Sequence, residues 1–385
     1  MSITPSDSFS AAWAGGEDAV REATAEAVKW LAGARPKLVV FFADAERPSD
    51  QVIEQAVAGS GGAPLAGMSA TGVITEDGLR HGGCSAIAFG GEDLAVGIGV
   101  AGEASRDLRR AGAAAAVAAV TGLALTAGHA VVLLFVDPKS GDERQAIAGA
   151  YEVVGGRVPL AGGGANGASP TLYADGSAHA DAVVAVALSS SASVEVATAH
   201  GCRPRGTPAL VTRARGRTVM ELNGRPAESV YLELVGRPGA TLTDAEFEAL
   251  AVLHPLAKPE LRGHLRLRHV TGRATDGGLA CVTPIPQNAA IWLAEQTEQT
   301  IVESAVHAVD AVTRNLPRPP KAALVFDCAA RRRALGPRVA EEAEGLVSAF
   351  GGELALAGLY TRGEVGRTRG SKGDLNHAVV VVGFG

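Results

Sequence analysis

Residues Val131–Asp137 have the sequence VVLLFVD, and this stretch decides the fold class. A short continuous run of Val, Leu and Phe predicts a strand that is buried on both faces. Similar runs occur at Leu38–Asp44 (LVVFFAD) and Ala322–Cys328 (AALVFDC). Three such runs in one chain predict an internal repeat.

The same series of elements is expected after each run. The predicted helices span residues 49–58, 143–154 and 337–350, and each ends near glycine, a common stop signal. A short strand then ends in Leu-Ala-Gly at 65–67, 160–162 and 356–358, and a loop containing glycine follows. The closing strands are expected at 84–89, 182–188 and 378–384. The helical connection in each unit is expected to return the chain parallel to the first strand. The sequence therefore predicts an α/β protein of repeated strand-helix-strand-loop-strand units forming mixed sheets.

A different pattern separates the second and third units. Helices are expected at residues 226–235, 243–250 and 296–312. His264–His269 alternates strictly, which predicts a strand with one basic face. Gly277-Gly278 indicates a hairpin turn.

Composition excludes several classes of protein. A chain of 385 residues is long enough for two domains of ordinary size, and a net charge of −6 does not attract a phosphate backbone, so no nucleic-acid partner is expected. Met1–Phe9 has no basic and apolar signal-peptide pattern. The four cysteines are far apart and form no C-x-x-C pair. We therefore expect a cytoplasmic protein with free thiols.

One segment is long enough to cross a bilayer. Ala111–Val136 contains no charged side chain apart from His129 when that is ionised. Its first half is rich in Ala and Gly, which add little transfer free energy. We interpret it as a small helix, a loop at Thr126–His129 and a buried strand, and we expect no membrane partner.

The common catalytic and cofactor motifs are incomplete. Gly162–Gly167 matches G-x-G-x-x-G, but a hairpin pattern follows it where a dinucleotide site needs a helix. Gly67–Thr71 lacks the last glycine of a nucleophile elbow. The spacing of the nine histidines gives no tight metal cluster.

Several segments, in this order, resemble the FIST family. Leu65–Val73 (LAGMSATGV) resembles the first signature of the FIST N-terminal domain. Further resemblances are at His200–Gly206, Val211–Gly216, Glu221–Ala227, Phe326–Arg331, Glu341-Glu342, Leu356–Glu364 (LAGLYTRGE) and Asn376-His377. The resemblance implies a two-domain FIST architecture, with an N-terminal segment at 1–34, a FIST N-terminal domain at 35–225 and a FIST C-terminal domain at 226–385.

The resemblance also implies a function. FIST proteins are regarded as sensory modules for small ligands, with amino acids or related metabolites proposed, and they are not classical enzymes. Relatives are often fused to kinases or cyclic-dinucleotide enzymes; here we expect a separate output protein of that kind. Some relatives are haem-dependent nitric-oxide sensors. We expect no cofactor here, with haem as the alternative and His254, His377 and Cys328 as its candidate ligands.

Glycine loops at strand ends are common ligand sites in α/β proteins, although they are also simply tight turns. We expect Arg362 to pair with a ligand carboxylate and Glu364 to meet an amine, the alternative being a surface salt bridge. The full set of predicted ligand-binding residues is Ser69, Thr71, Asn166, Arg331, Tyr360, Arg362, Glu364 and Asn376.

Cys328 occupies the strand-end place that Asp44 and Asp137 hold in the other units. It is either a reactive thiol or a small buried hydrophobe. An enzyme on the same scaffold that uses Cys328 or Glu364 is therefore a further alternative.

Overall fold

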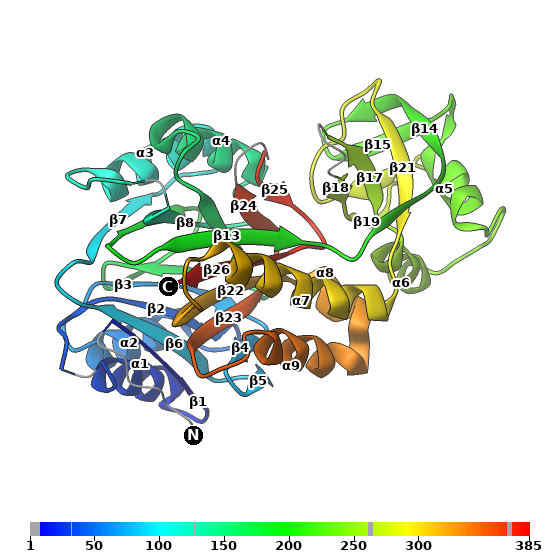
Figure 1. Ribbon diagram of the computed structural model, residues 1–385. Coiled ribbons are helices and arrows are strands. Elements are labelled where there is room, and N and C mark those ends of the chain that lie inside the picture. Colours follow the sequence, from blue (N-terminus) through cyan, green and yellow to red (C-terminus); the bar gives the residue numbers. More distant parts are fainter. Residues whose placement is uncertain (1–7, 32, 127, 261–264, 368–371) are drawn as a thin grey trace.

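The computed structural model describes residues 8–31, 33–126, 128–260, 265–367 and 372–385. His264, the first residue of one predicted strand, lies outside these ranges. Figure 1 shows a larger body and a smaller lobe joined to it by two connections, β13 to β14 and β21 to α7.

The body contains three units of the same design. Each unit has a first strand and helix, a central strand, a second helical connection, a parallel strand, a hairpin and a closing strand. Unit 1 consists of β1 (Phe9–Ala14), α1 (Ala19–Lys29), β2 (Pro36–Asp44), α2 (Ser49–Gly59), β3 (Leu65–Ala70), β4 (Val73–Thr75), β5 (Gly78–Arg80) and β6 (Cys84–Gly90). Unit 2 consists of β7 (Ala95–Ala101), α3 (Leu108–Val120), β8 (Ala130–Val136), α4 (Glu143–Val154), β9 (Leu160–Gly164), β10 (Leu172–Ala174), β11 (Ser177–His179) and β12 (Val183–Ser189).

Unit 3 is interrupted by the lobe after its first strand. It consists of β13 (Val194–Ala199), α7 (Glu298–Asn315), β22 (Ala322–Cys328), α8 (Ala329–Leu335), the 3₁₀ turn η2 (Gly336–Arg338), α9 (Val339–Ala349), β23 (Ala355–Thr361), β24 (Glu364–Arg367), β25 (Asp374–Leu375) and β26 (Val379–Phe384). The strand register confirms the repeat, because the glycine of each Leu-Ala-Gly lies beside an equivalent residue: Phe41↔Gly67, Leu134↔Gly162 and Val325↔Gly358.

The three central strands are apolar throughout because both of their faces are covered. In β2, Leu38, Val40 and Phe42 point into a core shared by all three sheets. Val39, Phe41 and Ala43 point the other way and pack under α1 and α2. The shared core places the ring of Phe326 5.9 Å from that of Phe42 and 6.1 Å from that of Phe135. Burying each such ring contributes about 2–3 kcal/mol.

The predicted glycine loops contain hairpins that cross to a neighbouring sheet. The hairpin of unit 1 pairs through β4 with β23 of unit 3, that of unit 2 through β10 with β3 of unit 1, and that of unit 3 through β24 with β9 of unit 2. The predicted strands and parallel pairs are confirmed, but β3, β9 and β23 continue two or three residues past the glycines at which they were expected to end. The cyclic exchange was not predicted.

The lobe comprises residues 203–295. Its elements are β14 (Arg203–Arg215), β15 (Thr218–Leu222), β16 (Arg225–Pro226), α5 (Ala227–Val235), α6 (Asp244–Leu253), β17 (Leu256–Pro259), β18 (Leu265–Arg268), β19 (Val270–Arg273), β20 (Leu279–Cys281) and β21 (Ala290–Glu295). Thr243 caps α6, as half of a capping box with Glu246. The boundary expected at 225/226 falls within β16, inside this lobe.

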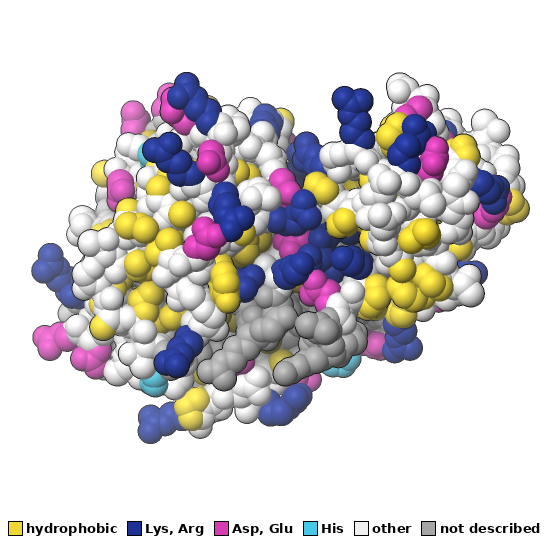
Figure 2. All heavy atoms as spheres, turned by 90° about the horizontal axis from the view of Figure 1, so that it is seen from above, with side chains coloured by type: hydrophobic (Ala, Val, Ile, Leu, Met, Phe, Trp, Pro, Cys, Tyr) yellow, Lys and Arg dark blue, Asp and Glu magenta, His cyan; other side chains and the backbone are white. Residues whose placement is uncertain are grey.

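The boundary between body and lobe carries several Lys and Arg side chains (Figure 2). Arg268 of β18 donates to Asp374 of β25 at 2.7 Å, and Arg266 lies 3.5 Å from the same carboxylate. The predicted basic face of this strand is therefore buried against the body, with Arg266 and Arg268 only 8% and 4% exposed.

The segment 111–136 folds as the sequence predicts, with α3 followed by the buried strand β8. No helix in the described residues combines the length and the hydropathy needed to cross a membrane. All four cysteines are free and buried.

Candidate functional site

The tips of the three glycine loops meet where the central strands end. The register of the three sheets makes Thr71, Asn166 and Arg362 equivalent positions. The Asn166 side-chain amide donates to Thr71 Oγ1 at 3.0 Å and to the Tyr360 carbonyl at 3.2 Å. One side chain of unit 2 therefore joins units 1 and 3. We call the region around Thr71, Asn166 and Arg362 the loop junction.

Backbone hydrogen bonds hold the loop junction together. The Asn166 amide donates to the Ser69 carbonyl and the Arg362 amide donates to the Gly164 carbonyl, both at 3.0 Å. The Ser69 hydroxyl donates to the Asn166 carbonyl at 2.9 Å and accepts from the Thr171 amide at 3.0 Å. Ser69 is 2% exposed, so its hydroxyl fixes the loops rather than facing solvent.

Two adjoining cavities border the loop junction, and both are lined by Thr71 and His81. The first, of about 570 Å³, extends along the loop after β2 and the one after β9. The second, of about 430 Å³, lies against α8 and the start of α9. Both volumes are in the range of small-molecule sites. We call the two together the junction groove.

The two ends of the junction groove carry opposite charges. Asp44 lines one end, and its Oδ1 accepts only from the nearby Glu46 amide among the described hydrogen bonds. Arg332 lines the other end, donates to Thr71 Oγ1 at 3.3 Å and lies 3.1 Å from His81 Nδ1. Its guanidinium also lies 5.5 Å from the centre of the Tyr360 ring. These contacts hold a cation at the edge of the groove.

Arg331, the neighbour of Arg332, is fully buried and engaged by protein groups. It pairs with Asp327 at 2.9 Å and Glu342 at 2.5 Å, and it donates to Ser304 Oγ at 2.8 Å. Burial raises the pKa of Glu342 to about 8, and it also raises the pKa of Asp327. The Tyr360 hydroxyl is buried beside these carboxyls without a hydrogen-bond partner among the described residues. Arg331 and Tyr360 therefore lie behind the groove rather than in it.

Glu364 is buried beside Cys328. Its carboxyl accepts from Thr361 Oγ1 at 3.2 Å and from the Ala378 amide at 3.4 Å. Burial raises the pKa of Glu364 to about 8. It raises the pKa of Cys328 well above its usual value, so this residue is a thiol at neutral pH and a poor nucleophile. Arg362, in contrast, is exposed at the loop junction.

Asn376 and His377 lie where the lobe contacts the body. Asn376 Oδ1 accepts from the His269 amide at 3.2 Å. The two nitrogens of His377 lie 3.1 Å from Gln296 Nε2 and 2.9 Å from His269 Nδ1. Burial lowers the pKa of His269 to about 4 and that of His377 well below its usual value, so both imidazoles are neutral. Sequence reasoning missed His269 and Gln296, because no local pattern marks the contact.

Two of the three candidate haem ligands, His377 and Cys328, do not fit a haem group. Both ring nitrogens of His377 face protein partners, and Cys328 is a buried thiol. His254 ends α6, with Nδ1 2.9 Å from the Leu250 carbonyl, and it does not line the junction groove. Within the described ranges, no group of three or more His, Cys, Asp or Glu side chains is placed to hold a metal ion.

Comparisons with known proteins find relatives of this chain in mycobacteria. An uncharacterized protein of Mycobacterium tuberculosis (strain ATCC 25618 / H37Rv) is 29% identical over 225 residues, covering 57% of each chain. An uncharacterized protein of Mycobacterium bovis is 29% identical over 224 residues, covering 57% of this chain and 56% of the relative. The chain thus spans little more than half the length of these relatives.

Among solved structures, a cyanuric acid hydrolase from A. caulinodans aligns over 97% of both chains with 12% identity and a TM-score of 0.42, which is too weak to indicate function. The family models give the decisive match. The FIST N domain matches residues 37–225 and the FIST C domain matches residues 227–367. The chain therefore belongs to the FIST family, whose domains are generally sensory, ligand-binding domains of signalling proteins.

Proposed function

We propose that this protein senses an amino acid or a related metabolite that binds in the junction groove. The observation that carries the proposal is the placement of Asp44 and Arg332 at opposite ends of a groove whose middle is formed by Thr71 and His81. A ligand with an ammonium group at one end and a carboxylate at the other is complementary to these charges. Because the groove is lined by residues of all three units, a ligand there contacts all of them.

Each end of the ligand has its own partner in this proposal. Arg332 pairs with the carboxylate, and exposed Arg362 at the same junction is a second carboxylate partner. Asp44 meets the ammonium group, since Glu364 is buried behind the loops. Thr71 and Asn166 orient the ligand by hydrogen bonds. The output passes to a separate protein such as a kinase or a cyclic-dinucleotide enzyme. The buried free cysteines are typical of a reducing compartment, which supports a cytoplasmic location.

The test is a thermal-shift screen of amino acids followed by titration calorimetry. At a ligand concentration about 100 times the dissociation constant, binding stabilises the protein by about 2.7 kcal/mol. Arg332→Ala is expected to weaken binding about tenfold or more, because a hydrogen bond to a charged group contributes about 1.5–3 kcal/mol. Arg203→Ala, an exposed arginine on the lobe, is the matched control and is expected to bind as wild type does.

Ligands that lack one charged group test the two ends of the junction groove separately. Asp44→Asn is expected to weaken binding of the amino acid but not of the same acid without its amino group. Arg332→Ala is expected to weaken the amino acid but not the amine that lacks the carboxylate. Amino-acid binding that survives Asp44→Asn, Arg332→Ala and Arg362→Ala unchanged would show that the junction groove is not the sensory site.

A further inference from the structure

The largest of the described cavities lies at the other end of the body from the junction groove. Its volume is about 740 Å³, and it runs between the loop from α4 to β9 and the edge strand β13. The loop from α4 leads into the first residue of β9, whereas the loop junction comes after the last residue of β9. Five strand residues at about 3.3 Å each separate the two regions by about 16 Å. We call it the β13 cavity.

The pseudo-threefold repeat places a smaller residue beside this cavity than at the equivalent position of unit 1. Val194 of β13 and Phe9 of β1 are equivalent positions, because Val194 pairs with Phe384 and Phe9 pairs with the equivalent residue Phe89. The Phe9 ring packs 5.8 Å from the rings of both Phe89 and Phe384. Unit 3 has the smaller valine at this place, and Val194 lines the β13 cavity. Val194 therefore presents a smaller side chain to the β13 cavity than Phe9 presents to the cavity of about 350 Å³ that it lines in unit 1.

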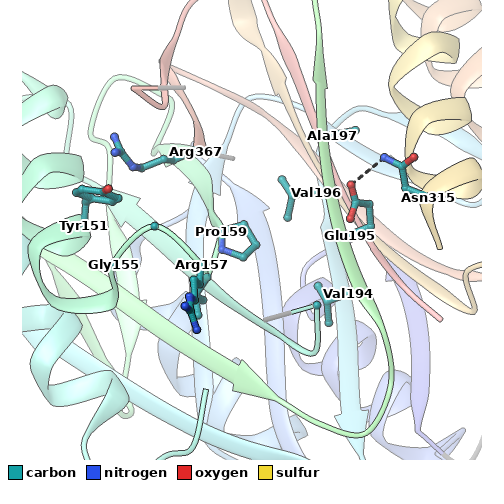
Figure 3. A pocket seen from close by; sticks show the side chains of 13 residues that line it. Tyr151, Gly155, Arg157, Pro159, Val194, Glu195, Val196, Ala197, Asn315 and Arg367 are labelled. Atoms are coloured by element: carbon teal, nitrogen blue, oxygen red, sulfur yellow. Dashed lines mark hydrogen bonds between the residues drawn. The ribbon is translucent and has the colours of Figure 1, made fainter. Parts of the chain in front are cut away.

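One wall of the β13 cavity is cationic. Figure 3 shows Tyr151, Arg157 and Arg367 on one side and β13 with Val194 and Val196 on the other. The Arg367 guanidinium stacks 3.4 Å from the centre of the Tyr151 ring and donates to the Lys372 carbonyl at 3.0 Å. Arg157 is exposed. Within the described part of the chain, neither arginine forms an ion pair with a carboxylate.

The rest of the lining compensates this positive charge only in part. The acidic side chain of the lining is Glu195, and its carboxylate accepts from Asn315 Nδ2 at 3.0 Å on the side of α7 (Figure 3). Val194, Val196 and Pro159 supply an apolar surface. Unpaired guanidinium groups favour carboxylates, and the apolar surface favours a ligand with a hydrocarbon body.

We propose that the β13 cavity is a second ligand site, which binds a small organic carboxylate with an apolar body. The acid group faces the wall that carries Arg157 and Arg367, and the apolar part lies on Val194, Val196 and Pro159. Its ligand needs no ammonium group, which distinguishes it from the ligand of the junction groove.

The test is titration calorimetry with naphthalene-2-carboxylate as the probe and neutral 2-naphthylmethanol as its uncharged match. Wild type is expected to bind one carboxylate per chain and to bind the alcohol about tenfold more weakly or not at all. Arg157→Gln and Arg367→Gln are each expected to weaken the carboxylate about tenfold and to leave the alcohol unchanged. Both arginines are at least partly exposed, so these variants are expected to fold.

Controls separate this site from the junction groove. Arg203→Gln and Arg332→Ala are expected to bind the probe as wild type does, whatever happens to amino-acid binding. Val194→Phe, which introduces the residue of unit 1, is expected to reduce binding of acid and alcohol alike. No heat at millimolar probe, equal affinity for acid and alcohol, or a wild-type affinity in both Arg157→Gln and Arg367→Gln would overturn the proposal.

Discussion

At the scale of single residues, burial determines what the polar groups near the loop junction do. Arg331 is buried, whereas its neighbour Arg332 is partly exposed. Likewise Glu364 is buried, whereas Arg362, two residues before it, is exposed. An arginine surrounded by carboxylates and carbonyls has no free donor for a ligand. The exposed member of each pair is therefore the one that we assign to ligand binding.

Glu364 gives a prediction about pH. Its folded pKa of about 8 lies above the ordinary glutamate value of 4.5, so between these values the folded state holds a proton that the unfolded state releases. The contribution of Glu364 to the free energy of unfolding therefore falls as pH rises from about 4.5 to 8. Glu364→Gln does not titrate. Its stability relative to wild type is expected to increase by at least about 1.4 kcal/mol between pH 5 and pH 9.

Urea unfolding at several pH values measures this difference. The control is Glu54→Gln on the exposed face of α2, where the change in stability is expected to stay within about 0.5 kcal/mol. If the free energies of unfolding of Glu364→Gln and wild type differ by the same amount at pH 5 and pH 9, Glu364 is not buried as described.

At the scale of elements, glycine permits two helices of unit 2 to approach closely. A Cβ at Gly149 of α4 would collide with the Arg109 carbonyl of α3, and one at Gly112 of α3 would collide with the Ala146 carbonyl of α4. The backbones of α3 and α4 therefore touch where these glycines cross. The sequence signals only that these helices are rich in small residues.

Gly149→Ala is expected to destabilise the protein by about 1–3 kcal/mol despite alanine's higher helix propensity, because the helices must separate. Gly345→Ala is the matched control on α9, where an added Cβ meets Val306 at an ordinary 3.6 Å. This control is expected to be neutral or to stabilise by up to about 1 kcal/mol. Thermal unfolding of both variants measures the effect; a neutral Gly149→Ala would show that α3 and α4 are further apart.

At the scale of the whole molecule, long-range contacts join units that are far apart in sequence. The hairpin exchange ties each sheet to the next, and a buried ion pair and a histidine pair tie the lobe to the body. Arg268 and Asp374 are separated by 106 residues, and His269 and His377 by 108. The lobe is therefore docked through unit 3, the unit that it interrupts.

Asp374→Asn is expected to weaken this docking. It leaves Arg268 and Arg266 buried beside a neutral side chain, and breaking a buried ion pair costs about 3–5 kcal/mol. Amide hydrogen exchange is expected to speed up in β18 and β25 while α3 and α4 keep their protection. Asp77→Asn, which breaks an exposed pair with Arg80, is expected to cost less than about 1 kcal/mol. Unchanged exchange in β18 would contradict the docking role.

The sequence alone determined the three central strands, their parallel partners, the helices that follow them and the family. These features follow from local patterns: apolar runs such as Val131–Asp137, helical periodicity and glycine stop signals. Only the tertiary structure decided that Thr71, Asn166 and Arg362 share one junction, that Arg331 is buried while Arg332 lines a groove, and that Val194 lines the β13 cavity. Burial and the pairing of distant strands depend on contacts between separate elements, such as those of Asn166 with Thr71 and Tyr360, 95 and 194 residues away, and no local pattern records them.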